Sequence, residues 1–234
     1  MTAIMHAPPR GPLVSVEGIS GVGKSYLTSR LVSAGEVAAI GEFSERLSGA
    51  ARTLGDELLR ALITEAHGEH FLRSGHPGTE TLLLIAVKAF DYDQCLPLLT
   101  QGRIVVEGRS LDSIAVYQSL ITHGDDFDRA YADANAILTL AAQWRPLPDL
   151  TILILDDVAT AVSRAETRDR RRFSDEQWGI HSKAAAMFSL LAADQAVRFR
   201  VIDRRRHTID QAVAQSAAWL ADLCTRLTDA RRTG

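Results

Sequence analysis

A glycine-rich segment near the start of the chain restricts the fold more than any other feature. Residues 18–25 read G-I-S-G-V-G-K-S and match the pattern G-x-x-x-x-G-K-[ST]. An apolar run, LVSVE at 13–17, precedes this segment, and a stretch with leucines at helical spacing follows it. In such a strand–loop–helix context the pattern cradles phosphates with backbone amides and the positive end of the helix dipole. The segment therefore predicts a loop that binds the phosphates of ATP or a close relative.

Positions within this loop have distinct predicted roles. Lys24 can reach the β- and γ-phosphates, and the Ser25 hydroxyl can ligate Mg²⁺. The other positions would wrap the phosphates with main-chain groups. The residues expected to bind ATP are Gly18, Ser20, Gly21, Val22, Gly23, Lys24, Ser25 and Tyr26.

Short apolar runs alternate with longer helical stretches along the rest of the chain. Strands separated by helices require right-handed β-α-β crossovers and give an α/β fold with a parallel sheet covered on both faces. A chain of 234 residues fits one such domain. We expect residues 12–234 to form it, with a flexible tail at 1–11. The strands are expected at 13–17, 37–40, 104–107, 150–156 and 199–203.

Composition argues against several other classes of protein. The net charge of -3 does not suit a general nucleic-acid binder. No apolar run approaches the roughly 18 residues that a membrane span needs, and residues 1–12 lack the apolar centre of a signal peptide. Cys95 and Cys224 show no metal or redox spacing. We therefore expect a cytoplasmic protein that binds neither nucleic acid nor membrane.

A phosphate loop alone does not separate kinases from GTPases or ATP-driven machines. Guanine-specific switches usually carry an N-K-x-D element, and none of the chain's lysines, at 24, 88 and 183, lies in one. ATP-driven machines usually place a catalytic Glu after an Asp at the end of a strand, where this chain has Asp156 and Asp157. The compact length and the arginine-rich stretch at 168–172 favour a small-molecule kinase.

Further segments make the sequence similar to the thymidylate kinase family of P-loop kinases. TLGDELLR at 53–60 resembles the family's T-x-L-G-E-x-I-R helix, and residues 109–118 resemble its R-Y-x-x-S-x-x-A-Y-Q segment. PDLT at 148–151 resembles the start of a family strand. The resemblance spans about 13–215. It implies a three-layer P-loop kinase sandwich with a central five-stranded parallel sheet, and an arginine-rich lid at about 168–176.

The resemblance also implies an activity. It points to transfer of the γ-phosphoryl group of ATP, with Mg²⁺ as the second cofactor, to a pyrimidine deoxynucleoside monophosphate, dTMP first. Arg109 would hold the acceptor phosphate, because a guanidinium suits two phosphate oxygens at once. Lid arginines would neutralise charge that develops on the transferring group. A homodimer is implied as well.

The site residues follow from these roles. Lys88 stands where the family has an arginine that contacts thymine, and Tyr117 where it packs a tyrosine against the deoxyribose. The expected catalytic residues are Lys24, Glu107, Arg109, Arg168 and Arg172. The expected acceptor contacts are Glu42, Phe43, Leu84, Lys88, Arg109, Ser113 and Tyr117. The expected metal ligands are Ser25 and a carboxylate, Glu107 or Asp156.

The base pocket departs from the family pattern more than the phosphate machinery does. Leu84 stands in place of the aromatic residue that stacks on thymine, and Ile114 in place of a polar residue. The E-G-R-S run at 107–110, together with Glu42, partly resembles deoxynucleoside kinases, in which a carboxylate base serves a neutral hydroxyl. Three functions therefore stay open: phosphorylation of dTMP, phosphorylation of a nucleoside or other small hydroxyl compound, and nucleotide binding without catalysis.

Overall fold

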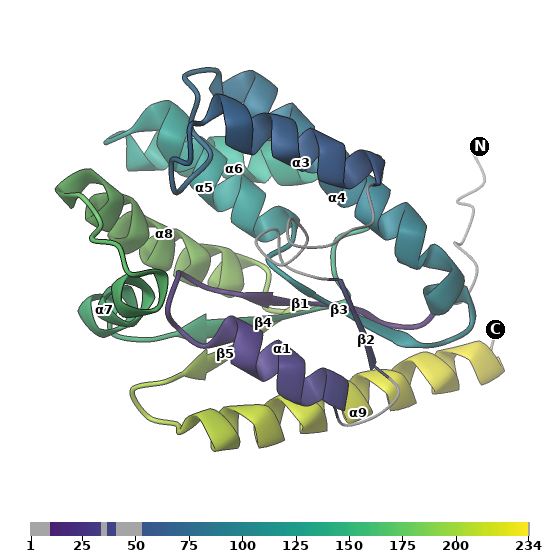
Figure 1. Ribbon diagram of the computed structural model, residues 1–234. Coiled ribbons are helices and arrows are strands. Elements are labelled where there is room, and N and C mark those ends of the chain that lie inside the picture. The colour runs from purple at the N-terminus through teal and green to yellow at the C-terminus, as the bar shows by residue number, and fades with distance from the viewer. Residues whose placement is uncertain (1–9, 34–36, 41–52, 234) are drawn as a thin grey trace.

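Parallel strands form the centre of the protein (Figure 1). The computed structural model describes residues 10–33, 37–40 and 53–233. In this described part the sheet has five strands in the order β2-β3-β1-β4-β5, and every neighbouring pair is parallel. The strands are β1 Leu13–Glu17, β2 Val37–Ile40, β3 Ile104–Gly108, β4 Leu150–Leu155 and β5 Phe199–Asp203.

Helices cover both faces of this sheet. In Figure 1, α1 and α9 lie on one face, whereas α4, α5 and α8 lie on the other, with α3 packed on α4 and α6 on α5. The described helices are α1 Lys24–Ser33, α3 Leu54–Glu65, α4 Pro77–Thr100, α5 Leu111–His123, α6 Phe127–Ala141, α7 Val158–Asp169, α8 Asp175–Asp194 and α9 Ile209–Thr233.

The central strands are apolar because helices bury them from both sides. Val14, Val16 and Ile152 have no exposed surface and belong to the main core between the layers. A strand buried on both faces reads as a nearly continuous apolar run rather than an alternating one. Strand β1 is central: β2 and β3 lie on one side of it, and β4 and β5 lie on the other. Ligands of open α/β sheets bind at such a switch point, outside the carboxyl ends of the strands.

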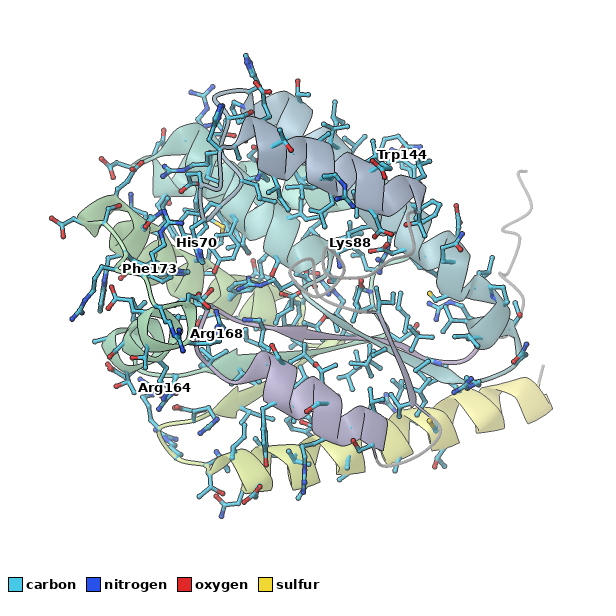
Figure 2. The ribbon with its side chains drawn as sticks, viewed as in Figure 1. His70, Lys88, Trp144, Arg164, Arg168 and Phe173 are labelled. Carbon is cyan, nitrogen blue, oxygen red and sulfur yellow. The ribbon has the colours of Figure 1, made fainter. Side chains whose placement is uncertain are left out.

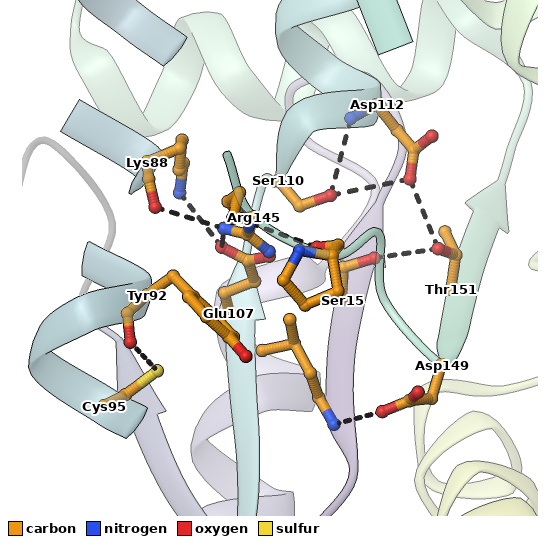
Figure 3. A network of polar contacts seen from close by, with 12 residues as sticks. Ser15, Lys88, Tyr92, Cys95, Glu107, Ser110, Asp112, Arg145, Asp149 and Thr151 are labelled. Atoms are coloured by element: carbon orange, nitrogen blue, oxygen red, sulfur yellow. Dashed lines mark hydrogen bonds and ion pairs between the residues drawn. The ribbon is translucent and has the colours of Figure 1, made fainter. Parts of the chain in front are cut away.

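Buried polar contacts hold the start of α5 at this carboxyl edge (Figure 3). Ser110 caps the helix by accepting a hydrogen bond from the Asp112 amide. The Asp112 carboxylate pairs with Arg198 at 2.6 Å and accepts a hydrogen bond from Thr151 on β4. Helix α5 is therefore tied to β4, and the residues just before it have a defined position.

The fold predicted from the sequence is confirmed. All five predicted strands are present, and their ends differ from the prediction by no more than one residue. The predicted lid at about 168–176 comprises the end of α7, a short link and the first turn of α8. Most of the predicted tail, residues 1–9, lies outside the described residues. Within the described part, no helix is both long and apolar enough to cross a membrane.

Candidate active site

The glycine-rich loop between β1 and α1 passes so close to other backbone at two positions that only glycine fits there. Gly18 and Gly21 have φ angles of +132° and +83°. A Cβ atom on Gly18 would lie 2.4 Å from the Ile154 carbonyl oxygen, and one on Gly21 would lie 1.8 Å from that of Ala161. Both contacts are far inside van der Waals distance. The loop therefore passes directly against β4 and α7, in a conformation that other residues do not adopt.

Lys24 begins α1 and folds back over this loop. Its side chain is only 5% exposed, and Nζ donates a hydrogen bond to the Ile19 carbonyl oxygen at 2.8 Å. The next residue, Ser25, is exposed at the helix start. Tyr26 is 45% exposed, and its ring lies 6.0 Å from the Arg30 guanidinium on the surface of α1. The loop, Lys24 and Ser25 thus lie together, and the Tyr26 ring extends along the outside of the helix.

Arg109 follows β3 and reaches across to the loop. It adopts a left-handed backbone conformation, with φ of +63°, which is uncommon for a residue with a side chain. Its guanidinium Nη2 donates a hydrogen bond to Ser20 Oγ at 3.1 Å. The same guanidinium lies 5.6 Å from the centre of the Tyr117 ring. Arg109 therefore lies between the phosphate loop and helix α5.

Glu17 at the end of β1 joins the loop to the start of α5. Its carboxylate accepts hydrogen bonds from the Ser110 amide and from Ser113 Oγ, both at 2.5 Å. Burial, and then the nearby Asp112 carboxylate, raise the pKa of Glu17. Ser113, for which a contact to the acceptor stays a prediction, donates its hydroxyl to Glu17. Sequence reasoning did not place Glu17 in the site, although its position before the glycine loop was a signal.

Glu107 is at the centre of a buried ion cluster with Arg145 and Lys88 (Figure 3). Arg145 donates from Nη2 at 2.6 Å and from Nη1 at 3.1 Å, and Lys88 Nζ lies 3.5 Å from Oε2. Burial alone would raise the pKa of Glu107, but Arg145 and Lys88 outweigh it and lower the pKa. Two cations already compensate this carboxylate. Magnesium binding at Glu107 stays a prediction that this geometry does not favour.

Asp156 is the other carboxylate that the sequence predicts as a magnesium ligand. It follows β4, the neighbour of β1, and accepts a hydrogen bond from Arg164 Nη1 at 2.6 Å. No group of three or more His, Cys, Asp or Glu side chains that could hold a metal occurs among the described residues. Mg²⁺ at kinase sites needs only one or two protein carboxylates, because phosphates and water supply the rest. Asp156 is one such carboxylate, and magnesium binding by Asp156 with the Ser25 hydroxyl stays a prediction.

The predicted lid arginines lie on the outer part of the lid. Arg168 pairs with Asp169 at 2.7 Å, and Arg172, whose side chain is 92% exposed, pairs with Glu166 at 3.0 Å. Figure 2 shows Arg164 and Arg168 on α7. An exposed pair such as Arg168–Asp169 is worth about 0–1 kcal/mol, whereas Glu166 is itself buried and also accepts from the Phe173 amide. Both arginine side chains are more than half exposed, so each can reach another anion.

The comparisons with known proteins decide the family. A model described as thymidylate kinase matches residues 16–215. The chain belongs to the thymidylate kinase family. It is 32% identical over 217 residues to the thymidylate kinase of Jannaschia sp. (strain CCS1), covering 88% of this chain and 97% of that protein. It is 31% identical to the thymidylate kinase of Geobacter sulfurreducens, covering 82% and 89%.

Solved thymidylate kinases share the fold. The Candida albicans thymidylate kinase aligns with a TM-score of 0.65 over 93% of both chains, at 21% sequence identity. The Ehrlichia chaffeensis enzyme aligns with a TM-score of 0.55, over 83% of this chain and 92% of the other, at 22% identity. The family and the P-loop kinase fold expected from the sequence are therefore confirmed.

The part of this thymidylate kinase-family site that would face the acceptor base is aliphatic and buried. Leu84 and Ile114 both belong to the main core. Lys88 is buried beside Glu107, and it also makes an interaction beyond that ion pair. Glu42 and Phe43 lie outside the described residues. The expected substrate contacts at Glu42, Phe43, Leu84, Lys88, Arg109, Ser113 and Tyr117 stay predictions.

Besides Glu17, three more residues near this site were not among those predicted. Arg145 holds Glu107, Phe71 stacks on Tyr117 with ring centres 5.4 Å apart, and His181 touches the Tyr117 hydroxyl. Each partner pair is separated by at least 38 residues along the chain. No local pattern signals such pairings, so a single sequence offered no way to find them.

Proposed function

We propose that this chain transfers the γ-phosphoryl group of ATP to dTMP and releases ADP and dTDP. One observation carries the proposal: the Arg109 guanidinium contacts Ser20 of the phosphate loop at 3.1 Å. A cation suited to an acceptor phosphate thus lies beside a loop suited to donor phosphates. Membership of the thymidylate kinase family supports the choice of dTMP.

The transfer needs two phosphates held in line. In the reaction an acceptor phosphate oxygen forms a bond to the γ-phosphorus, while the bond from that phosphorus to the β,γ-bridging oxygen breaks. Little covalent chemistry falls to the protein, so catalysis is positioning and charge stabilisation. Arg109 orients the acceptor phosphate, and Lys24 leaves the Ile19 carbonyl to contact the transferring group. The acceptor phosphate is already ionised, so no general base is required.

The cofactors of the family, ATP and Mg²⁺, fit the residues present. Main-chain amides of the loop at 18–25 would hold the ATP phosphates, and glycine is required at two of its positions by the close approach of β4 and α7. Ser25 and Asp156 would hold Mg²⁺, which neutralises phosphate charge when bound. Arg204 extends from the end of β5 and contacts the Val22 carbonyl oxygen at 3.4 Å. This position suits it to the nucleoside end of ATP.

Lid arginines supply the remaining positive charge. The side chains of Arg168 and Arg172 are 58% and 92% exposed, so closure of the lid would turn them toward the phosphates. Exclusion of water by the closed lid would limit transfer of the phosphoryl group to water. Arg168 and Arg172 are therefore assigned to stabilise the transferring group.

A homodimer and a cytoplasmic location complete the proposal. Large apolar side chains are exposed on α3, α4 and after α6, at Leu54, Leu82 and Trp144. Exposed apolar residues on adjacent helices are consistent with a subunit interface. Light scattering on the purified protein would measure the mass. A mass near twice 25.5 kDa is expected, and a monomer at micromolar concentration would contradict the dimer.

A coupled assay of ADP release over a panel of acceptors tests the function. The panel contains dTMP, the other nucleoside monophosphates, thymidine and the other nucleosides, with Lys24→Ala as the control for contaminating kinases. The expected result is release of ADP that depends on dTMP and is lost in Lys24→Ala. Activity on thymidine without activity on dTMP would replace the proposal by a nucleoside kinase. Tight ATP binding with no acceptor-dependent release would replace it by a non-catalytic binding protein.

A further inference from the structure

Five aromatic rings from separate parts of the chain gather next to Arg109. His70 and Phe71 come from the loop between α3 and α4, Tyr117 from α5, Phe173 from the lid, and His181 from α8. The His181 ring lies 5.1 Å from Phe71, 5.2 Å from Phe173 and 6.1 Å from Tyr117. Figure 2 labels His70 and Phe173, which lie close together near α8. This cluster links the lid to the acceptor side of the site.

His181 is a polar group in a place that a hydrocarbon ring would fill equally well. Its side chain has no exposed surface, and Nε2 has no hydrogen-bond partner among the described residues. Nδ1 lies 3.4 Å from the Tyr117 hydroxyl, a long contact that substrate binding can tighten. A buried polar ring is unfavourable unless it is hydrogen-bonded. Only Nδ1 has a partner here, the Tyr117 hydroxyl, so this contact is the one polar interaction that the ring makes among the described residues.

The protonation state of His181 suits it to accept a hydrogen bond. Burial, followed by the nearby charges of His70, Arg109 and Lys24, lowers the pKa of His181 to about 3. The ring is therefore neutral at physiological pH. When Nε2 carries the proton, Nδ1 is an acceptor for the Tyr117 hydroxyl. The influence of Lys24 and Arg109 also places His181 near the two cations assigned to the donor and acceptor phosphates.

Tyr117 is placed to meet the sugar of the acceptor. Its ring lies 5.6 Å from the Arg109 guanidinium. In a nucleoside monophosphate the pentose is the group next to the phosphate, and the family resemblance implies that the tyrosine at this position packs against it. Phe71 stacks on this ring at an angle of 26°, and Phe188 meets it edge-on at 6.3 Å. These contacts hold the ring from two sides.

We infer that His181 is a positioning residue: it fixes Tyr117 against the pentose and so sets the preference for deoxyribose over ribose acceptors. The inference rests on the proposed function. The Tyr117 ring can exclude the 2′-hydroxyl of a ribose acceptor only if the ring is held in place. A ring that moves aside removes the steric clash, and with it the preference for deoxyribose. At its hydroxyl end, which the stacking contacts do not hold, the ring is hydrogen-bonded to His181 on α8 and to Arg109. Arg109 also binds the acceptor phosphate in the proposed function, so His181 is the partner that restrains the ring independently of the substrate.

His181→Phe tests this role because it keeps an aromatic ring and removes the acceptor nitrogen. The measurement is kcat/KM with dTMP divided by kcat/KM with the ribose analogue of dTMP. Loss of one hydrogen bond should lower this ratio by about 3- to 10-fold, while kcat with dTMP changes little. His181→Gln, whose amide oxygen can accept from Tyr117, should restore part of the ratio. His70→Phe is the matched control and should leave the ratio unchanged, since no hydrogen bond joins His70 to Tyr117.

Tyr117→Phe keeps the test decisive if His181→Phe does not fold. It removes the hydroxyl that contacts both His181 and Arg109, so it should lower the ratio by at least a similar factor. Adding His181→Phe to it should produce no further loss. An unchanged ratio in a folded, active His181→Phe or Tyr117→Phe enzyme would overturn the inference and leave the proposed function intact. A wild-type protein that is inactive on dTMP would overturn both.

Discussion

The phosphate loop, residues 18–25, and the acceptor wall are built on different principles. The acceptor wall is the predicted acceptor-binding surface formed by Phe71, Leu84, Lys88, Ile114 and Tyr117. Along the loop, the backbone is the functional part, and glycine is required at Gly18 and Gly21 because a side chain would strike β4 or α7. Along the acceptor wall, side chains are predicted to be the functional part, and they come from α4, α5 and the loop before α4. Every ATP-dependent enzyme meets the same triphosphate, but each meets a different acceptor. The loop therefore keeps the G-x-x-x-x-G-K-S pattern, with Ser20 in place of the family's acidic residue, whereas the wall departs from the family at Leu84 and Ile114.

Charge is also handled differently in the two regions. Near the wall, Glu107 and Arg145 form a wholly buried pair. Around the phosphate loop, the lid arginines stay exposed and pair with neighbours that they can leave. Buried pairs hold a structure in one arrangement, whereas exposed pairs permit movement. The first prediction tests the loop and the second tests the buried pair, and both have large expected effects.

Lys24→Ala should reduce kcat by about 10²- to 10⁴-fold, because an ammonium group that meets charge in the transition state is lost. The fold should survive, since the lysine side chain lies over the loop and not in the apolar core. Steady-state kinetics with thermal unfolding as a control measures both. Near-normal turnover in a folded variant would mean that the loop does not act on the transferring group.

Arg145→Met should destabilise the protein by about 3–5 kcal/mol, because it leaves Glu107 buried and uncompensated except by Lys88. Chemical denaturation measures the change in the free energy of unfolding. The double variant Glu107→Gln, Arg145→Met should recover much of the loss, since the isolated charge is removed. A cost below about 1 kcal/mol for the single variant would show that water reaches Glu107 and that the pair is not structural.

Arg109→Ala should raise KM for dTMP by about 30- to 100-fold, the value of a charged, bidentate contact to phosphate. Its effect on KM for ATP should be small, because the loop holds the donor through its own amides. The comparison of the two KM values sharpens the boundary between the two regions. Equal changes for both substrates would mean that Arg109 belongs to the donor site.

His181 should make the stability of the protein depend on pH in a specific window. The folded-state pKa is about 3, against 6.5 for the ordinary side chain. Below pH 6.5 the unfolded chain binds a proton that the folded protein rejects, so stability falls as pH falls toward 3. The slope from this group is at most about 1.4 kcal/mol per pH unit. His181→Phe removes this pH-dependent contribution. Chemical denaturation at pH 6.5 and pH 5 should therefore show a smaller decrease in the free energy of unfolding for the variant than for wild type.

The parts of this protein that follow from local sequence were predictable. Strands buried on both faces give continuous apolar runs, and the glycine loop has a pattern that fits one backbone geometry. The role of Glu107 was harder to predict, because a carboxylate at the end of an apolar strand can be a metal ligand or a member of an ion pair. Its partner Arg145 lies in a proline-containing segment with no signal of its own. The ring cluster around Tyr117 joins four segments, and only a three-dimensional structure brings them together.

The central claim is that one site holds donor and acceptor phosphates together, between the loop and Arg109. Its most direct test is calorimetric binding of an inhibitor in which adenosine and thymidine are joined through a chain of phosphates. The account predicts binding at least about 100-fold tighter than that of ATP or dTMP alone, because the second group binds at high effective concentration. This advantage should fall in both Lys24→Ala and Arg109→Ala. Binding no tighter than ATP alone would contradict a shared site.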